Sequence, residues 1–185
     1  MGICEAVSDA ELVALAADGD MDAFETLAGR YRGLMYAVCL RITCDDHDAV
    51  DAVQDALIDM WRRMGSFEGR SAVSTWLFRI AANAAIDEVR RRARRTAQSD
   101  LASGYHAGSH DVEAAAVTRS TVDWALARLP PQYRAPVVLR EYHDLTYQQI
   151  AEVLDISLDN VKARISRGRH ALADLLLPSF RGESG

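Results

Sequence analysis

Cysteine and long apolar runs are scarce in this sequence, and each scarcity excludes a class of protein. The three cysteines form no CxxC pair, so neither a disulfide scaffold nor a zinc site is expected. No apolar run approaches the roughly 20 residues that span a bilayer. The first residues carry Glu5 and Asp9, where a secretory signal needs basic residues. We therefore expect a globular protein of the cytoplasm that does not insert into a membrane.

Sequence signals for catalysis are missing as well. There is no glycine-rich phosphate loop, no nucleophile-elbow pattern, and no histidine, cysteine or carboxylate pair with a supporting third group. The acidic run Asp45, Asp46 and Asp48 lacks the spacing and the glycine of a calcium loop. Capping of a helix start explains this run more simply. We expect no enzyme activity, no metal, no cofactor and no small-molecule substrate.

The net charge of −6 conceals an alternation along the chain. Residues 1–60 carry thirteen acidic and three basic side chains, whereas residues 61–95 carry nine basic and three acidic ones. Residues 96–160 are again acidic, and residues 161–185 are basic. Twenty of the 21 basic residues are arginine, the side chain suited to bidentate contacts with phosphates and base edges. Two basic blocks predict two surfaces that face anions.

Helical periodicity runs through almost the whole chain. Apolar residues recur at helical spacing over 24–38, over 50–64 (with Val50 on the apolar side) and over 76–89. Ser8 and Glu11 have the spacing of a capping box. These patterns predict three helices in the amino-terminal half.

A change of composition divides the chain in two. Residues 96–113 lose the apolar period and are rich in small and polar side chains, as in a linker. The sequence predicts an all-α fold of two small helical domains, residues 8–95 and 114–180, joined by this flexible linker. In the second domain, Pro130-Pro131 should end one helix and open the next, and Pro136 should kink that helix or shift its start.

The segment 145–176 predicts a helix-turn-helix. Thr146 and Gln149 form a second capping-box pattern, and a turn at Asp155–Ser157 places Ser157 to cap the next helix. That helix has apolar residues on one side and mostly basic residues on the other, so it is suited to enter the major groove of DNA. The alternative is an ordinary helical hairpin with a solvated basic face.

A second candidate surface lies on the helix predicted over residues 75–95. Arg79, Asn83, Asp87 and Arg90 recur every three or four residues and share one face. This face, together with Phe67 and Trp76 near the preceding loop, suits the binding of an unstacked single strand. The alternative is a solvated face on which Asp87 pairs with Arg90 or Arg91, with Trp61 and Trp76 in the core.

Motifs in both halves resemble the extracytoplasmic-function (ECF) sigma factors, the promoter-specificity subunits of bacterial RNA polymerase. Residues 48–61 (DAVDAVQDALIDMW) resemble the polymerase-binding helix of region 2, and residues 67–90 its minus-ten recognition segment. Residues 129–151 resemble the start of region 4, and residues 161–169 (VKARISRGR) its minus-thirty-five reading helix. The resemblance covers about residues 8–180 with the motifs in family order.

The resemblance implies a role for each set of residues. Core-polymerase binding falls to Asp48, Asp51, Gln54, Asp55 and Trp61. Contact with the melted minus-ten strand falls to Phe67, Arg70, Ser71, Trp76, Arg79, Asn83 and Arg90. Contact with the minus-thirty-five duplex falls to Ser157, Asn160, Lys162, Arg164, Ser166, Arg167 and Arg169. Asp159-Asn160 stands where the family commonly has Gly-Thr, and the added acid should either alter base preference or weaken the attraction to phosphates.

The partners implied are core RNA polymerase, promoter DNA and an anti-sigma factor, which is often membrane-anchored and holds such a protein inactive. Two other functions remain open from the residues themselves. A helix-turn-helix repressor would use the second domain without polymerase. A protein-binding adaptor would leave both basic faces in solvent. Cys39 lies next to the apolar face of its helix, which predicts packing in place of redox chemistry.

Overall fold

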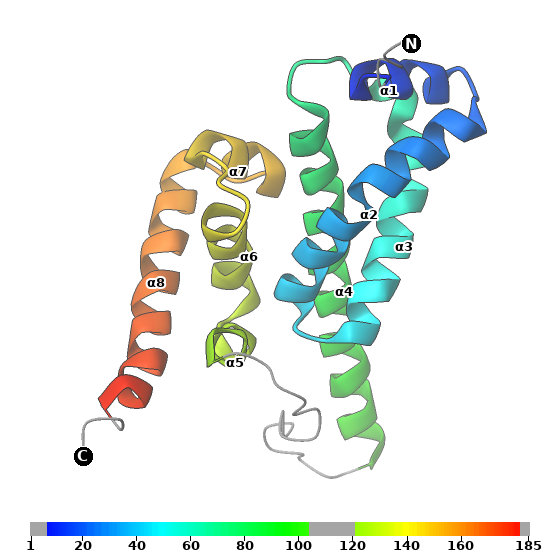
Figure 1. Ribbon diagram of the computed structural model, residues 1–185. Coiled ribbons are helices and arrows are strands. Elements are labelled where there is room, and N and C mark those ends of the chain that lie inside the picture. Colours follow the sequence, from blue (N-terminus) through cyan, green and yellow to red (C-terminus); the bar gives the residue numbers. More distant parts are fainter. Residues whose placement is uncertain (1–6, 104–120, 182–185) are drawn as a thin grey trace.

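The computed structural model describes residues 7–103 and 121–181, and within them all regular structure is helical (Figure 1). The predicted all-α fold is confirmed. The amino-terminal domain contains α1 (Asp9–Ala17), α2 (Met21–Thr43), α3 (Asp46–Arg63), the 3₁₀ turn η1 (Met64–Ser66) and α4 (Val73–Ser103). The carboxy-terminal domain contains α5 (Thr121–Arg128), α6 (Pro131–Glu141), α7 (Tyr147–Leu154) and α8 (Leu158–Arg181).

Side-chain caps from nearby residues define where several helices begin. The predicted capping boxes are present at Ser8, which caps α1, and at Thr146, which caps α7. Asp45 accepts from the backbone N–H groups of His47 and Asp48 at the start of α3, so capping accounts for this member of the acidic run, whereas Asp48 accepts from Arg92. Side-chain caps satisfy N–H groups that have no partner inside the helix.

The α4 helix is longer than predicted. It continues to Ser103, into the segment predicted as linker, and residues 104–113 of that segment lie outside the described residues. Residues 93–103 contain neither proline nor glycine to stop a helix. In the second domain, residues 114–120 also lie outside the described part. Pro136 is buried inside α6, which begins at Pro131 as expected.

Each domain has a core, and the two cores are continuous. In the first, α2, α3 and α4 pack together around fully buried side chains such as Leu27, Met35 and Met60. In the second, α8 packs on α6 so closely that Gly168 faces Val137 and Tyr133. The helices α6 and α7 lie against α2 and α4 (Figure 1), an arrangement that the sequence did not predict.

Candidate nucleic-acid interface

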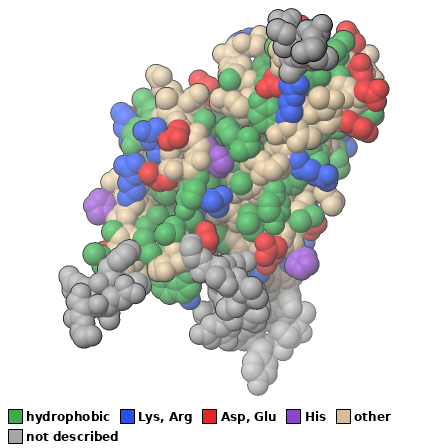
Figure 2. All heavy atoms as spheres, viewed as in Figure 1, with side chains coloured by type: hydrophobic (Ala, Val, Ile, Leu, Met, Phe, Trp, Pro, Cys, Tyr) green, Lys and Arg blue, Asp and Glu red, His purple; other side chains and the backbone are tan. Residues whose placement is uncertain are grey.

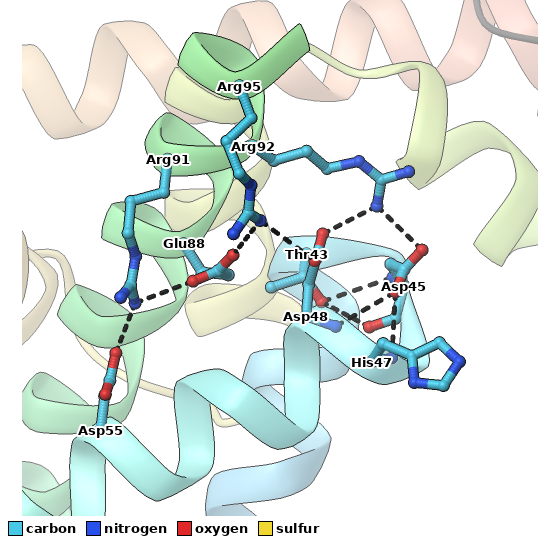
Figure 3. Close-up of polar contacts among 9 residues, drawn as sticks. All are labelled: Thr43, Asp45, His47, Asp48, Asp55, Glu88, Arg91, Arg92 and Arg95. Carbon is cyan, nitrogen blue, oxygen red and sulfur yellow. Dashed lines mark hydrogen bonds and ion pairs between the residues drawn. The ribbon is translucent and has the colours of Figure 1, made fainter.

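The arginine-rich segment 90–95 of α4 lies next to the acidic first turns of α3 (Figure 3). Glu88 is only 1% exposed, and its carboxylate accepts from Arg95 at 2.7 Å and pairs with Arg91 at 2.8 Å. Arg91 also reaches Asp55 on α3. The pair with Asp55 links α4 to α3, whereas the two contacts with Glu88 lie within α4 itself.

Arg92 makes the second link between the two helices. Its Nη1 donates to Asp45 at 2.8 Å and to Asp48 at 2.7 Å. Hydrogen bonds to Asp48 and then Asp45 raise the pKa of Arg92. Burial opposes ionisation of Asp45, but the bonds from Arg92 and from backbone N–H groups outweigh it, so the pKa of Asp45 is lowered. Both ends of this link are charged in the folded protein.

The remaining cations of α4 face outward. Arg79 and Arg94 are exposed and have no ion-pair partner among the described residues. Arg90 is exposed and pairs with Asp87 at 3.1 Å, one of the two pairings left open by the sequence. An exposed pair of this kind contributes little to stability, about 0–1 kcal/mol. Of the predicted minus-ten residues on α4, Arg79 is thus the fully available cation.

The segment before α4 brings two aromatic rings together. The rings of Phe67 and Trp76 have centroids 5.2 Å apart, and both side chains are half-buried. Arg70 is exposed and pairs with Glu68, and the intervening Gly69 has a φ of 68° that favours glycine. Ser71 is half-buried beside them. The pair of rings leaves a partly exposed aromatic surface at the start of α4.

The predicted polymerase-binding residues on α3 separate into two groups. Asp48 is 8% exposed and Asp55 is bonded to Arg91, so both act within the domain. Asp51 and Gln54 are exposed, and Trp61 is 36% exposed with its ring edge-on to Phe24. Beside them lie two exposed apolar side chains that the sequence did not single out for binding, Val50 and Ile58. The apolar period predicts Val50 on the buried side, and this prediction is wrong.

The second domain has the predicted helix-turn-helix. After α7, Asp155 takes a φ of 51° and turns the chain, and the Ser157 hydroxyl accepts from the backbone N–H of Asn160 at 3.3 Å to cap α8. The α7–α8 unit is packed on α6. Figure 2 shows Lys and Arg side chains gathered over the α7–α8 side of the molecule.

The predicted minus-thirty-five residues lie along the first three turns of α8. Ser166 and Arg167 are exposed, and Arg167 has no ion-pair partner within the described ranges. Lys162 pairs with Asp159 at 3.3 Å, and Arg164 donates to the Asn160 amide oxygen at 3.1 Å. Arg169 pairs with Glu141 on α6 at 2.5 Å. Most of these cations are therefore held in place by neighbours.

The structure contains a groove between the two domains that the sequence did not predict. Its volume is about 1390 Å³, and α3, α4, α6 and the α7–α8 turn line it. Asn83 from the first domain and Arg164 from the second both face it. No local sequence signal marks a groove of this kind, because its two walls come from different domains.

Other kinds of site receive no support. Within the described residues, no three His, Cys, Asp or Glu side chains come close enough to hold a metal. None of the helices in that part of the chain is both long and apolar enough to cross a membrane. Cys39 is fully buried, which confirms its predicted packing role, and burial raises the pKa of its thiol to about 12.

Two family models match the chain, one in each domain. Sigma-70 region 2 matches residues 27–95, and Sigma-70, region 4 matches residues 121–172. Three relatives match over nearly the whole length. The RNA polymerase sigma-H factor of Pseudomonas aeruginosa is 34% identical over 94% of this chain and 96% of its own. The ECF RNA polymerase sigma-E factor of Haemophilus influenzae is 31% identical over 95% and 99%. The ECF RNA polymerase sigma factor SigM of Mycobacterium tuberculosis is 36% identical over 95% and 92%.

Solved structures of other sigma factors resemble the fold. The sigma factor RpoE from Bartonella quintana, in complex with the anti-sigma factor NepR, is 26% identical with a TM-score of 0.66, covering 83% of this chain and 96% of that one. CnrH, in complex with the cytosolic domain of CnrY, is 28% identical with a TM-score of 0.63, covering 91% and 96%.

Proposed function

Because this chain belongs to the extracytoplasmic-function sigma factors of bacterial RNA polymerase, we propose that it binds core polymerase and directs it to a specific set of promoters. One observation carries the proposal. The same chain contains a helical bundle with a cationic and aromatic face and a second domain with a helix-turn-helix. The chain acts in the cytoplasm and supplies recognition, while the polymerase supplies the chemistry of RNA synthesis.

The minus-ten strand is proposed to bind along the start of α4. Arg79 offers an unpaired cation, and Asn83 offers an amide for a base edge. The partly exposed rings of Phe67 and Trp76 suit stacking with an unpaired base. Arg70, Ser71 and Arg90 border this surface and complete the predicted set. Arg91, Arg92 and Arg95 have a different role, since their ion pairs with Asp55 and Asp48 link α4 to α3.

The minus-thirty-five duplex is proposed to bind α8. The exposed Arg167 suits a phosphate or a guanine edge, and Lys162, Ser166 and Arg169 lie along the same three turns. Near the start of α8, Asp159 is 93% exposed. A carboxylate in this position accepts from the amino group of cytosine. We expect Asp159→Asn to change the base selected at one position of this element while other positions keep their preference, as measured by selection from a randomised promoter library.

Core polymerase is proposed to bind the exposed side of α3. The exposed Asp51 and Gln54 lie next to the exposed apolar side chains Val50 and Ile58 on α3, with Trp61 near the end of the helix. Exposed apolar side chains next to polar ones are typical of a protein–protein interface. Asp48 and Asp55 support this surface from beneath, because they bind the arginines of α4.

An anti-sigma factor is the proposed regulatory partner. Both RpoE and CnrH, which share this fold, have been solved in complexes, the first with an anti-sigma factor and the second with the cytosolic domain of CnrY. A protein that covers α3 or α8 would compete with polymerase or with promoter DNA for the surfaces described above.

Run-off transcription tests the proposed function. Core polymerase is incubated with fragmented genomic DNA of the host, with and without the chain, and start sites are mapped. We expect new, discrete start sites only when the chain is present. Arg167→Glu should remove most of this activity, whereas Arg32→Glu, a matched charge reversal at an exposed position of α2, should leave it unchanged.

A gel shift without polymerase distinguishes the alternative. A helix-turn-helix repressor would bind its duplex tightly by itself, whereas we expect weak and salt-sensitive binding by the isolated chain. Discrete binding without polymerase, together with no new start sites, would refute the proposed function.

A further inference from the structure

Carboxylates occupy most of the arginines in the segment 90–95 of α4 (Figure 3). The most deeply buried of these carboxylates belongs to Glu88, whose side chain is 2% exposed. It pairs with Arg91 at 2.8 Å and with Arg95 at 2.7 Å. Asp55 on α3 pairs with Arg91 as well. Arg91 therefore lies between two carboxylates, one from each helix.

The start of α3 supplies two more carboxylates. Arg92 pairs with Asp48 at 2.7 Å and with Asp45 at 2.8 Å. Asp48 also lies 3.9 Å from Arg95. Acids and arginines thus alternate without a break along the contact between α3 and α4. We refer to the four acids as the network carboxylates: Asp45, Asp48, Asp55 and Glu88.

The arginines of this network are at the surface, but their charge is not free. The side chains of Arg91, Arg92 and Arg95 are 41%, 52% and 61% exposed. A DNA phosphate could therefore reach each of them. Three guanidinium groups and four carboxylates together leave the network with a formal charge of −1. Arg94, in the same segment, is exposed and has no ion-pair partner in the described part of the chain.

Stability alone does not explain a carboxylate at position 88. The desolvation of a buried ion pair offsets most of its Coulombic gain, and apolar residues of similar size often do as well or better. An apolar residue at this position could fill the same space between α4 and α3. It could not neutralise Arg91 and Arg95. The property specific to Glu88 is therefore its charge.

We propose that the network carboxylates mask Arg91, Arg92 and Arg95 from DNA phosphates, so that the free chain does not bind non-specific duplex through these side chains. Non-specific affinity for DNA comes almost entirely from cations that neutralise phosphates and release counterions. The benefit of the masking rests on the proposed function, because a chain held on random DNA is not available to core polymerase. Arg79, which is not in the network, stays free for the minus-ten strand.

Fluorescence anisotropy with a labelled duplex of random sequence tests the masking on the full chain without polymerase. Glu88→Gln leaves Arg95 with one acidic neighbour, at 3.9 Å, which is beyond hydrogen-bond distance. One released cation should steepen the fall of log affinity with log salt concentration by about 0.9. It should also raise the affinity at about 50 mM salt by about three- to tenfold. Asp48→Asn, which removes a partner of Arg92 and Arg95, should shift both quantities in the same direction.

The matched control is Glu25→Gln, the same substitution at an exposed position of α2. It changes the net charge equally but releases no arginine of the network, so it should leave the salt dependence unchanged. A purely structural role for Glu88 predicts lower stability with no gain in affinity for DNA. The sign of the change in affinity therefore separates masking from structural support.

The outcomes also separate the masking from the proposed function. Wild-type affinity and salt dependence in both Glu88→Gln and Asp48→Asn would overturn the masking, and so would an equal gain in Glu25→Gln. Circular dichroism checks the fold of each variant, and Asp48→Asn decides the question should Glu88→Gln fail to fold. If run-off transcription shows no new start sites, the proposed function fails, while anisotropy still reports whether the carboxylates mask the arginines.

Discussion

Gly168 on α8 offers a stability test whose sign follows from one contact. A Cβ built at this position would lie 2.6 Å from Val137 Cγ2 and 3.3 Å from the backbone oxygen of Tyr133. Val137 is 1% exposed, so its side chain has no space into which to rotate. Overpacking of this kind costs about 1–3 kcal/mol, whereas alanine in a helix interior is better than glycine by about 1 kcal/mol. The difference is a net loss of up to about 2 kcal/mol for Gly168→Ala.

The matched control is Gly33→Ala in the interior of α2, where a Cβ would meet nothing within 4 Å. This variant keeps the helix-propensity gain of about 1 kcal/mol without the clash. Thermal unfolding followed by circular dichroism should therefore move the two variants in opposite directions. A change of 1 kcal/mol shifts Tm by about 2–4 °C in a protein of this size. If Gly168→Ala proved as stable as Gly33→Ala, the close packing of α8 on α6 would be refuted.

Three further predictions concern buried or paired groups. Glu88→Gln should cost about 1–2 kcal/mol of unfolding free energy in urea titrations, because it removes a charge-assisted contact at a fully buried carboxylate; Asp87→Asn, next to it but exposed, should cost less than about 0.5 kcal/mol. The pKa of Asp9 is lowered from its ordinary 3.8, first by the hydrogen bond from Tyr31, so its contribution is present above pH 3.8 and is lost as the pH falls through the folded value. Asp9→Asn should accordingly reduce the loss of stability as the pH falls below about 4, and an unchanged acid profile would contradict this. Burial raises the pKa of Cys39 to about 12, so a thiol reagent at about pH 8 should modify it only after unfolding; rapid labelling of the folded chain would show that the core is open.

Features set by neighbouring residues were predictable from the sequence. The capping boxes at Ser8 and Thr146 depend on residues three positions apart, and the structure contains both. The turn at Asp155 and the cap at Ser157 follow the same logic and place α8 correctly. Apolar periodicity predicted the helices but misplaced Val50, because a residue at the margin of an apolar stripe can lie on either side of the boundary.

The sequence did not predict which arginines of α4 pair with α3 and which point into solvent. Residues 90–95 contain five arginines, and periodicity indicates only that they are spread around the helix. Arg91, Arg92 and Arg95 are directed toward α3 because its first turns present Asp48 and Asp55 there, next to the buried Glu88. Partners 36 to 47 positions away in the chain decide this outcome.

The sequence by itself determined the helices, their caps, the helix-turn-helix and the family, since all of these depend on residues within a few turns of one another. Only the tertiary structure decided which carboxylates are buried, why position 168 has to be glycine, and that α6 and α7 pack on α2 and α4. Arg134 illustrates the physical reason. Its partner is the backbone carbonyl of Ile42, 92 positions away in the chain. Because every residue has a backbone carbonyl, no pattern of side chains in the sequence predicts this hydrogen bond.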